Sequence, residues 1–203
     1  MSTEGAAGRQ KRSNPRRQQL IDAAAELFMR HAYDAVSVKM ICTHAGITGP
    51  GLYRHFPNKQ ALLLAVLDES LHLVHDEARR IASSTPDAEE ALIAMVESHL
   101  RLVLDGPPSP LIFLKSEHAL PEAERRRIRR EMSIYAEEWI SVLIPLRPDL
   151  SESEVRLLTQ TVFAMLNVTA TLRKGLDLES IVSTMKPAAL HALLGHGAAE
   201  SHL

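Results

Sequence analysis

A four-residue step between two unusually short helical segments restricts the fold of this chain more than any other feature. Residues 38–44 and 49–56 both have helical character, and the sequence AGIT at positions 45–48 joins them. Ser37 stands where a helix takes a capping side chain, and Gly46 suits the left-handed conformation that ends a helix. Since helices average about 11 residues, two shorter ones joined in this way predict a helix-turn-helix.

The second short segment begins with Gly49-Pro50-Gly51. With Thr48 as the cap, these residues occupy the first helical turn, where N–H groups have no partner within the helix and proline is tolerated. The glycines leave the backbone bare, so a phosphate or a base edge can approach the positive end of the helix closely. An ordinary tight turn before a capped helix explains the same sequence without DNA.

A helix-turn-helix holds its second helix out from a small core, where that helix enters the major groove of DNA. We therefore expect the polar and basic side chains around it to contact base edges and phosphates. Base contacts are predicted for Lys39, Thr48, Pro50 and Arg54, and phosphate contacts for Tyr53, His55 and Lys59. The complete predicted DNA-binding set adds Arg16, Arg17, Ser37, Gly49 and Gly51.

The charge of the chain changes along its length. Residues 1–59 contain nine Lys and Arg against four Asp and Glu, whereas residues 60–203 contain fourteen against twenty-one. A basic front and an acidic remainder indicate that only the front meets a polyanion. The basic residues that precede the first helix or lie at its start favour the DNA-binding interpretation over the simple turn: Arg9, Lys11, Arg12, Arg16 and Arg17.

Helical spacing of apolar residues accounts for the rest of the chain. Asn14-Pro15 begins a first helix that ends near position 31, and Asn58 caps a long helix that runs to about position 83. A capping box, Ser151-x-x-Glu154, begins another helix. The last helix is expected over residues 177–194, where Pro187 should kink or divide it.

The alternating pattern of strands is missing from the sequence, so the predicted fold class is all-α. Residues 1–13 are polar and basic without periodicity and are expected to form a flexible arm. Residues 14–60 form the predicted N-terminal three-helix helix-turn-helix DNA-binding domain. Residues 61–203 form a predicted C-terminal helical domain for effector binding and dimerisation.

The sequence from 36 to 67, VSVKMICTHAGITGPGLYRHFPNKQALLLAVL, resembles the N-terminal DNA-binding region of the TetR family of one-component transcriptional regulators. The resemblance extends over about residues 14–67. It implies a cytoplasmic homodimer that regulates transcription, usually as a repressor. It also implies that the protein leaves double-stranded operator DNA when a small-molecule effector binds its C-terminal domain.

The helix that follows Ser151 is apolar nearly all round, which predicts a core on one side and a partner subunit on the other. A purely intramolecular core is the alternative. The predicted dimer-interface residues are Leu158, Val162, Leu166, Ile181, Met185, Leu190 and Leu194.

An effector site is expected between the C-terminal helices, because such sites are mostly apolar with a few polar groups. The predicted effector-binding residues are Met95, His99, Phe113, Met132, Tyr135, Trp139, Phe163 and Asn167. Each of them also fits an ordinary core position. An apolar or acyl-type effector is the hypothesis, and its binding is expected to move the long helix that carries the reading unit.

The sequence ERRRIRRE at 124–131 is a dense basic run. A solvated helix face with Ile128 turned inward explains it simply. The alternative is a docking site for a phosphate-bearing effector such as a coenzyme A thioester.

Several classes of protein are disfavoured. The single cysteine, Cys42, excludes an internal disulfide and a multi-cysteine metal site. The uncharged run at 157–172 is shorter than the ~20 apolar residues of a membrane span, and no apolar signal segment begins the sequence. Nucleophile-elbow, P-loop and metal-helix motifs are missing, so we predict no enzyme, cofactor or metal site. A ligand-independent DNA-binding protein or interaction module of the same fold is the alternative function.

Overall fold

The computed structural model describes residues 14–105, 109–172 and 175–195, and the predicted basic arm lies outside these residues. The described part contains no strand, which confirms the all-α prediction. Its elements are α1 (Pro15–Arg30), η1 (Tyr33–Ala35), α2 (Val38–Ala45), α3 (Gly49–Tyr53), α4 (Lys59–Ser84), α5 (Ala88–Asp105), α6 (Ser109–Ser116), η2 (Glu117–Ala119), α7 (Glu122–Leu143), η3 (Ile144–Leu146), α8 (Glu152–Leu172) and α9 (Leu178–Leu194), where η denotes a 3₁₀ helix.

The predicted helix caps are confirmed. The side chains of Asn14, Ser37, Thr48 and Asn58 each accept a hydrogen bond from a backbone N–H of the turn that follows. Gly46 takes the left-handed conformation with φ 64°, which ends α2. These local interactions fix where the short helices begin and end.

Two predicted helix features differ from the structure. α3 ends at Tyr53 rather than at position 56, because the chain turns there and buries the ring of Phe56 in the core. Pro187 does not divide the last helix, because α9 continues through it. The hydrogen bond that proline cannot donate would go to the carbonyl of Ser183, and both residues are on the exposed side of the helix, where water can replace it.

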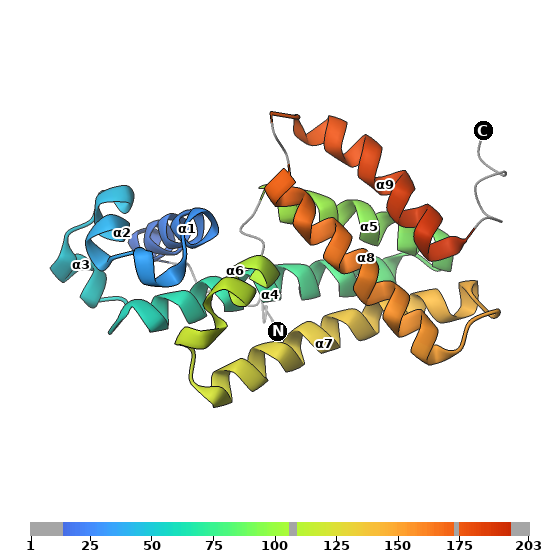
Figure 1. Cartoon of the computed structure of the whole chain (residues 1–203), viewed down its shortest axis with the longest axis horizontal. Helices are drawn as coiled ribbons and strands as arrows, with labels where there is room; N and C mark the ends of the chain where they lie inside the picture. Colours follow the sequence, from blue (N-terminus) through green and yellow to red (C-terminus); the bar gives the residue numbers. More distant parts are fainter. Residues whose placement is uncertain (1–13, 106–108, 173–174, 196–203) are drawn as a thin grey trace, which may run out of the picture.

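Helices α1 to α3 and the first half of α4 lie together at one end of the molecule, where α1 packs on α4 and α2 packs on α1 and α3 (Figure 1). We call their core the N-terminal core. It consists of buried apolar residues between Leu20 and Leu71, joined by Ile112 and Phe113 of α6, by Leu120, which follows η2, and by Ile128 of α7. The predicted N-terminal domain therefore packs against residues from the middle of the chain.

The second half of α4 belongs to a different core, which we call the bundle core. It begins at Ala78 and Ile81 in α4 and combines buried apolar residues of α5, α7, α8 and α9. α4 thus crosses from one core to the other between Leu71 and Ala78. The predicted domain boundary between residues 60 and 61 falls inside this shared helix and remains a prediction.

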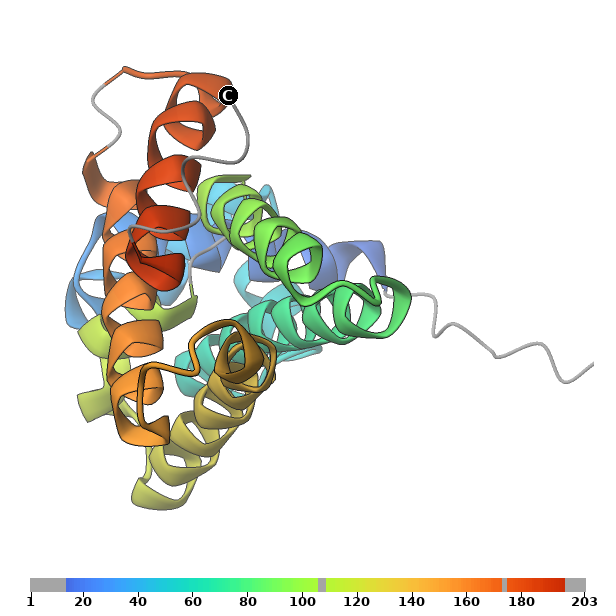
Figure 2. The same ribbon diagram turned by 90° about the vertical axis from the view of Figure 1, so that its right-hand side faces the viewer.

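α8 and α9 lie side by side along one flank of the bundle (Figure 2). α8 is the one helix of the described residues that is long and apolar enough to cross a membrane by length and composition alone. The core helix of a soluble protein passes the same test. Since α8 packs against α5, α7 and α9, we assign it to the bundle.

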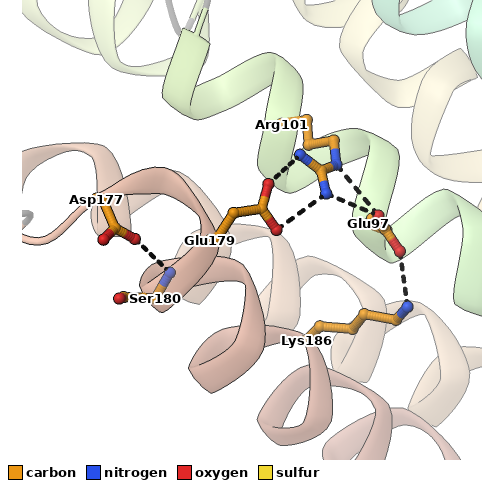
Figure 3. Close-up of polar contacts among 6 residues, drawn as sticks. All are labelled: Glu97, Arg101, Asp177, Glu179, Ser180 and Lys186. Atoms are coloured by element: carbon orange, nitrogen blue, oxygen red, sulfur yellow. Dashed lines mark hydrogen bonds and ion pairs between the residues drawn. The ribbon is translucent and has the colours of Figure 1, made fainter.

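A network of ion pairs links α9 to α5 (Figure 3). Arg101 pairs with Glu179 at 2.8 Å and with Glu97 at 3.1 Å, and Glu97 also binds Lys186 at 2.7 Å. These groups are partly exposed, so the network contributes little to stability. It nevertheless specifies how α9 sits along α5.

The two glycines of α3 have different surroundings. A Cβ atom at Gly51 would lie 2.9 Å from Cγ2 of Ile47 and 3.2 Å from Oγ1 of Thr48, whereas a Cβ at Gly49 would meet nothing within 4 Å. Gly51 therefore lets the helix pack closely on its own turn, and only Gly49 presents an open backbone.

We predict that Gly51→Ala lowers the free energy of unfolding by about 1–2 kcal/mol, because the new methyl group overpacks the turn. The matched change Gly49→Ala should be neutral or stabilise by a few tenths of a kcal/mol. Urea unfolding of both variants checks this. Equal stabilities would contradict the assignment of Gly51 to close packing.

Candidate functional site

The surface of α2 and α3 presents most of the side chains predicted to contact DNA. Lys39, Thr48, Pro50, Tyr53 and Arg54 are all exposed. Thr48, Pro50, Tyr53 and Arg54 follow one another over the turn, the short helix α3 and its end, while Lys39 lies near the start of α2. The geometry matches an element that reads a groove.

Ser37 and Thr48 of the predicted set also cap helices. The hydroxyl oxygens of Ser37 and Thr48 accept hydrogen bonds from Met40 N at 3.1 Å and Gly51 N at 3.3 Å. A hydroxyl that caps a helix keeps a free lone pair and its hydrogen, so both side chains can still approach DNA.

Arg17 and His55 line a shallow pocket together with residues of the first half of α4. Arg16 is exposed, while Arg17 is half-buried with its guanidinium 5.1 Å from the centre of the Phe56 ring. His55 is half-buried. Arg17 therefore supports the domain as well as facing its surface.

Lys59 is turned away from the surface on which a phosphate contact was predicted. Its ammonium group donates hydrogen bonds to the backbone oxygens of Tyr33 at 2.8 Å and Val36 at 2.9 Å, and it lies 3.8 Å from the centre of the Tyr33 ring. Burial lowers the pKa of Lys59, and Asp34 opposes that shift. Lys59 thus ties η1 to the start of α4, and its donors are occupied within the domain.

A second site lies in the helical bundle, where α4, α5, α6, α7 and α8 enclose a cavity of about 470 Å³. Six of the eight predicted effector residues line it: His99, Phe113, Met132, Tyr135, Phe163 and Asn167. Met95 and Trp139 do not, because both are fully buried in the bundle core behind the wall. Most of the lining is apolar.

The sequence analysis missed other lining residues, including Leu102, Arg129 and Gln160. Each stands three positions from a predicted one on the same helix: Leu102 from His99, Arg129 from Met132, and Gln160 from Phe163. Helical spacing from the predicted residues would have found them.

The inner wall of the cavity is aromatic. The rings of His99, Tyr135 and Phe163 lie nearly parallel, with centroids 5.2–5.8 Å apart, and Trp139 stands edge-on behind them. Nδ1 of His99 lies 2.9 Å from the Tyr135 hydroxyl. Burial lowers the pKa of His99 to about 4, although a hydrogen bond with the Asn167 side chain opposes the shift, and burial raises the pKa of Tyr135. Both groups are neutral at physiological pH.

The arginine run on α7 is largely paired. Arg126 binds Glu122, Arg127 binds Asp68 and Glu124, and Arg129 binds Glu117 at 2.6 Å. Ile128 is buried, as predicted. The run therefore forms an ion-paired face, and Arg129 is the member that also reaches the cavity.

The predicted dimer residues divide into two groups. Val162, Leu166 and Ile181 are fully buried in the bundle core of a single chain, so a partner cannot contact their side chains. Leu158, Met185, Leu190 and Leu194 are half-buried. The exposed apolar residues of α8 are instead Leu157, Val168 and Leu172, which are 67%, 41% and 59% exposed.

Within the described residues, no group of three or more His, Cys, Asp or Glu side chains is placed to hold a metal ion. Cys42 is buried in the N-terminal core, and burial raises the pKa of its thiol.

The helix-turn-helix unit matches a known protein family. Residues 20–66, from α1 into the first part of α4, match the family described as "Bacterial regulatory proteins, tetR family". The match covers the short α2 and α3 helices and the turn between them.

Curated relatives are transcriptional regulators. The chain is 36% identical over 97 residues to the activator FasR of Mycolicibacterium smegmatis, which is 45% of this chain and 44% of FasR. It is 23% identical over 168 residues to the fatty acid metabolism regulator protein of Bacillus subtilis, covering 79% of this chain and 84% of that protein. It is 29% identical over 129 residues to the repressor KstR2 of Rhodococcus jostii, covering 63% of each. The chain thus matches less than half the length of FasR.

Solved structures share the whole fold. A TetR-family regulator from Bordetella parapertussis superposes with a TM-score of 0.77 at 21% identity, covering 88% of this chain and 93% of that one. AibR in complex with isovaleryl coenzyme A and operator DNA gives 0.70 at 19% identity, covering 85% and 97%. FadR of Bacillus subtilis in complex with stearoyl-CoA gives 0.69 at 18% identity, covering 88% and 97%. At these identities the likeness concerns the fold.

Proposed function

We propose that the chain, whose residues 20–66 match the tetR family of bacterial regulatory proteins, is a cytoplasmic homodimeric repressor that an apolar or acyl-type effector releases from operator DNA. The proposal rests on the combination of two features. The recognition helix α3 is exposed, and the helical bundle contains a cavity. A closed and fully packed bundle would favour the ligand-independent alternative instead. The cavity of about 470 Å³ argues against that alternative.

DNA binding is assigned to the exposed side chains of α2 and α3. Lys39 and Arg54 carry charge without an ion pair among the described residues, so they are free to meet base edges or phosphates. Gly49 presents open backbone at the start of α3. Lys59 is left out of this assignment, because its donors are satisfied inside the domain.

Dimerisation is assigned to the exposed faces of α8 and α9. Exposed residues recur along α8 at helical spacing: Leu157, Thr161, Ala164, Val168 and Leu172. On α9 the exposed residues near the proline are small, Thr184, Pro187 and Ala188. A second copy of the chain fits this surface for two reasons. The small residues of α9 allow helices to approach closely, and burying the leucines and the valine of α8 removes apolar surface from water.

The effector is assigned to the bundle cavity. An acyl chain fits the apolar walls, and two of the solved structures named above, those of AibR and of FadR from Bacillus subtilis, hold a coenzyme A thioester. Arg129 at the cavity is exposed and paired with Glu117, so a phosphate group of such an effector can compete for its guanidinium. The charged part of the ligand would then stay near solvent while the apolar part enters.

The cavity is joined to the reading unit through α6. Phe113 lines the cavity and also belongs to the N-terminal core. Beyond it, Lys115 donates to Met29 O at 2.9 Å, His118 lies 3.0 Å from Asp34, and Gln60 bonds the carbonyl of Ala119. A ligand that displaces Phe113 would therefore push on α1, η1 and α4 together. The two recognition helices of a dimer would lose their spacing of about 34–36 Å.

Sequence-specific binding of operator DNA is the first test of the proposed function. The protein should bind DNA from upstream of its own gene roughly a thousandfold more tightly than unrelated DNA, with a steep salt dependence. Arg54→Ala and Lys39→Ala should each weaken binding by about 1–3 kcal/mol for a base contact, or reduce the salt slope by about 1 for a phosphate contact. Fluorescence anisotropy over a salt series measures both effects.

Arg130→Ala is the matched control for that experiment, because Arg130 is an exposed arginine on α7 whose removal changes the net charge equally. It should leave operator affinity unchanged. Equal weak binding to both DNAs would contradict sequence-specific regulation by this chain.

The second prediction concerns self-association. The chain should sediment as a dimer of its 22.5 kDa protomer, and Leu172→Glu should shift it to a monomer, because a charge cannot be buried unpaired at the interface. Met40→Glu, at an exposed methionine of α2, is the control and should stay dimeric. A Leu172→Glu protein that still sediments as a dimer would place the interface elsewhere.

The third prediction concerns coupling. Medium- and long-chain acyl-coenzyme A thioesters should release the operator from the native protein, while Phe113→Leu should need at least about fivefold more thioester, which is the lower range of allosteric coupling. Leu114→Ala alters the next residue, which lines the cavity but lies outside the N-terminal core, and should keep its coupling. Normal release by the Phe113→Leu protein would exclude the α6 route.

A further inference from the structure

The side chains that line the bundle cavity reach the surface at two places. Most of the exposed ones come from α6, α7 and α8, and we call this group the rim: Leu114, Arg129, Ser133, Gln160 and Ala164. The other exposed lining residue is Leu73 of α4, which is 51% exposed. Figure 2 shows α8 on the left of the bundle, with α4 and α5 to its right. The cavity therefore extends from the rim to the side formed by α4 and α5.

A second hollow adjoins the cavity on that side. The groove between α4 and α5 is lined by Asp76, Glu77, Arg80, Ile81, Ala94, Glu97, Ser98 and Arg101, together with Leu73 and Leu102. Leu73 and Leu102 also line the cavity, and they are the described residues that the two hollows share. The side chains of these two leucines therefore stand between the cavity and the groove.

The two sides of the leucine pair differ in polarity. On the groove side, Arg80 pairs with Glu77 at 2.6 Å. Arg101 pairs with Glu97 at 3.1 Å, and Asp76 adds another acidic group. On the cavity side most of the lining is apolar. An apolar chain gains by burial in the cavity, whereas beyond the leucines its methylene groups would displace water from charged side chains. An apolar chain is therefore best accommodated when it ends at the leucine pair.

We infer that Leu73 and Leu102 form the end wall against which the terminal methyl group of the effector's apolar chain rests, and that this pair sets the longest chain the cavity accepts. The inference rests on the proposed role of the cavity as the effector site. Protein interiors are closely packed, so a chain that is too long has to displace a leucine or fold back on itself. Two side chains thus determine the chain-length specificity of the site.

The opposite orientation, with the chain ending at the rim, fits less well. The phosphates of a coenzyme A thioester would then lie in the groove, whose lining has three acidic residues and two arginines, both of them paired. Carboxylates beside an anion oppose its binding. The described lining of the cavity contains no acidic residue, and Arg129 at its rim is exposed. The charged end of the effector therefore belongs at the rim and the methyl end at the leucines.

The test measures how affinity depends on chain length. Saturated straight-chain acyl-coenzyme A thioesters, from hexanoyl to stearoyl in steps of two carbon atoms, are titrated into the protein below their micelle concentrations. Isothermal titration calorimetry records binding directly, without a probe in the cavity. The native protein is compared with Leu73→Ala and Leu102→Ala, which each remove the branched end of one leucine from the wall.

In the native protein, each added pair of methylene groups should raise the affinity until the chain reaches the wall, and the next pair should lower it. In both alanine variants the best-bound chain should be longer by at least one step of the series. The first thioester beyond the native limit should bind them about tenfold more tightly than it binds the native protein, which is the lower range of discrimination by a methylene group. Leu73 belongs to neither core, so its variant keeps the test open if Leu102→Ala fails to fold.

Leu114→Ala is the matched control, because it truncates an exposed leucine that lines the cavity at the rim and does not line the groove. Its best-bound chain should have the native length. If the best length moves in Leu114→Ala and stays fixed in Leu73→Ala, the chain lies in the opposite orientation and the inference is wrong.

Two further results would overturn the inference, and they differ in what else they reject. If the best length is the same in the native protein and both wall variants, or if affinity still rises at stearoyl in the native protein, the leucine pair is not the end wall, while the cavity remains the effector site. If no thioester of the series binds the native protein, the proposed effector site fails together with the inference.

Discussion

The burial of α4 in two different cores is the constraint on which the rest of the structure depends. Its first half is buried in the N-terminal core with helices α1 to α3, and from Ala78 onward it belongs to the bundle core. Protein interiors are packed too densely to absorb a displacement without passing it on. A shift of the bundle against α4 must therefore reach α1, α2 and α3, and this physical link makes regulation of DNA binding by a distant cavity feasible.

A second link runs beside α4 and makes the arrangement more rigid. α6 contributes Ile112 and Phe113 to the N-terminal core, and Leu120, which follows η2, joins them. Polar side chains of α6 and η2 bond the end of α1 and Asp34 of η1. Lys59 closes the same region from within, where its ammonium group holds two backbone carbonyls. Helices α1 to α3 are thus attached to the rest of the chain at several points. We therefore expect them to move together when the bundle shifts.

Local sequence patterns predicted the fold well, because each depends on a few neighbouring residues. The caps at Ser37 and Thr48, the left-handed Gly46 and the capping box at Ser151 were found from spacing alone. Six cavity residues were found because apolar spacing selects the inner face of a helix. The errors arose where distant parts of the chain decide. Lys59 is occupied by carbonyls more than twenty positions earlier, and which side of α8 is covered depends on α5, α7 and α9.

The cavity also has an energetic meaning. An open space of about 470 Å³ makes the bundle less stable than a fully packed one would be. A ligand that fills the space adds stability only in the arrangement of α5, α6, α7 and α8 that fits it. The same cavity that weakens the bundle therefore gives a ligand its differential affinity for one conformation, which is the requirement for shifting a population between two states.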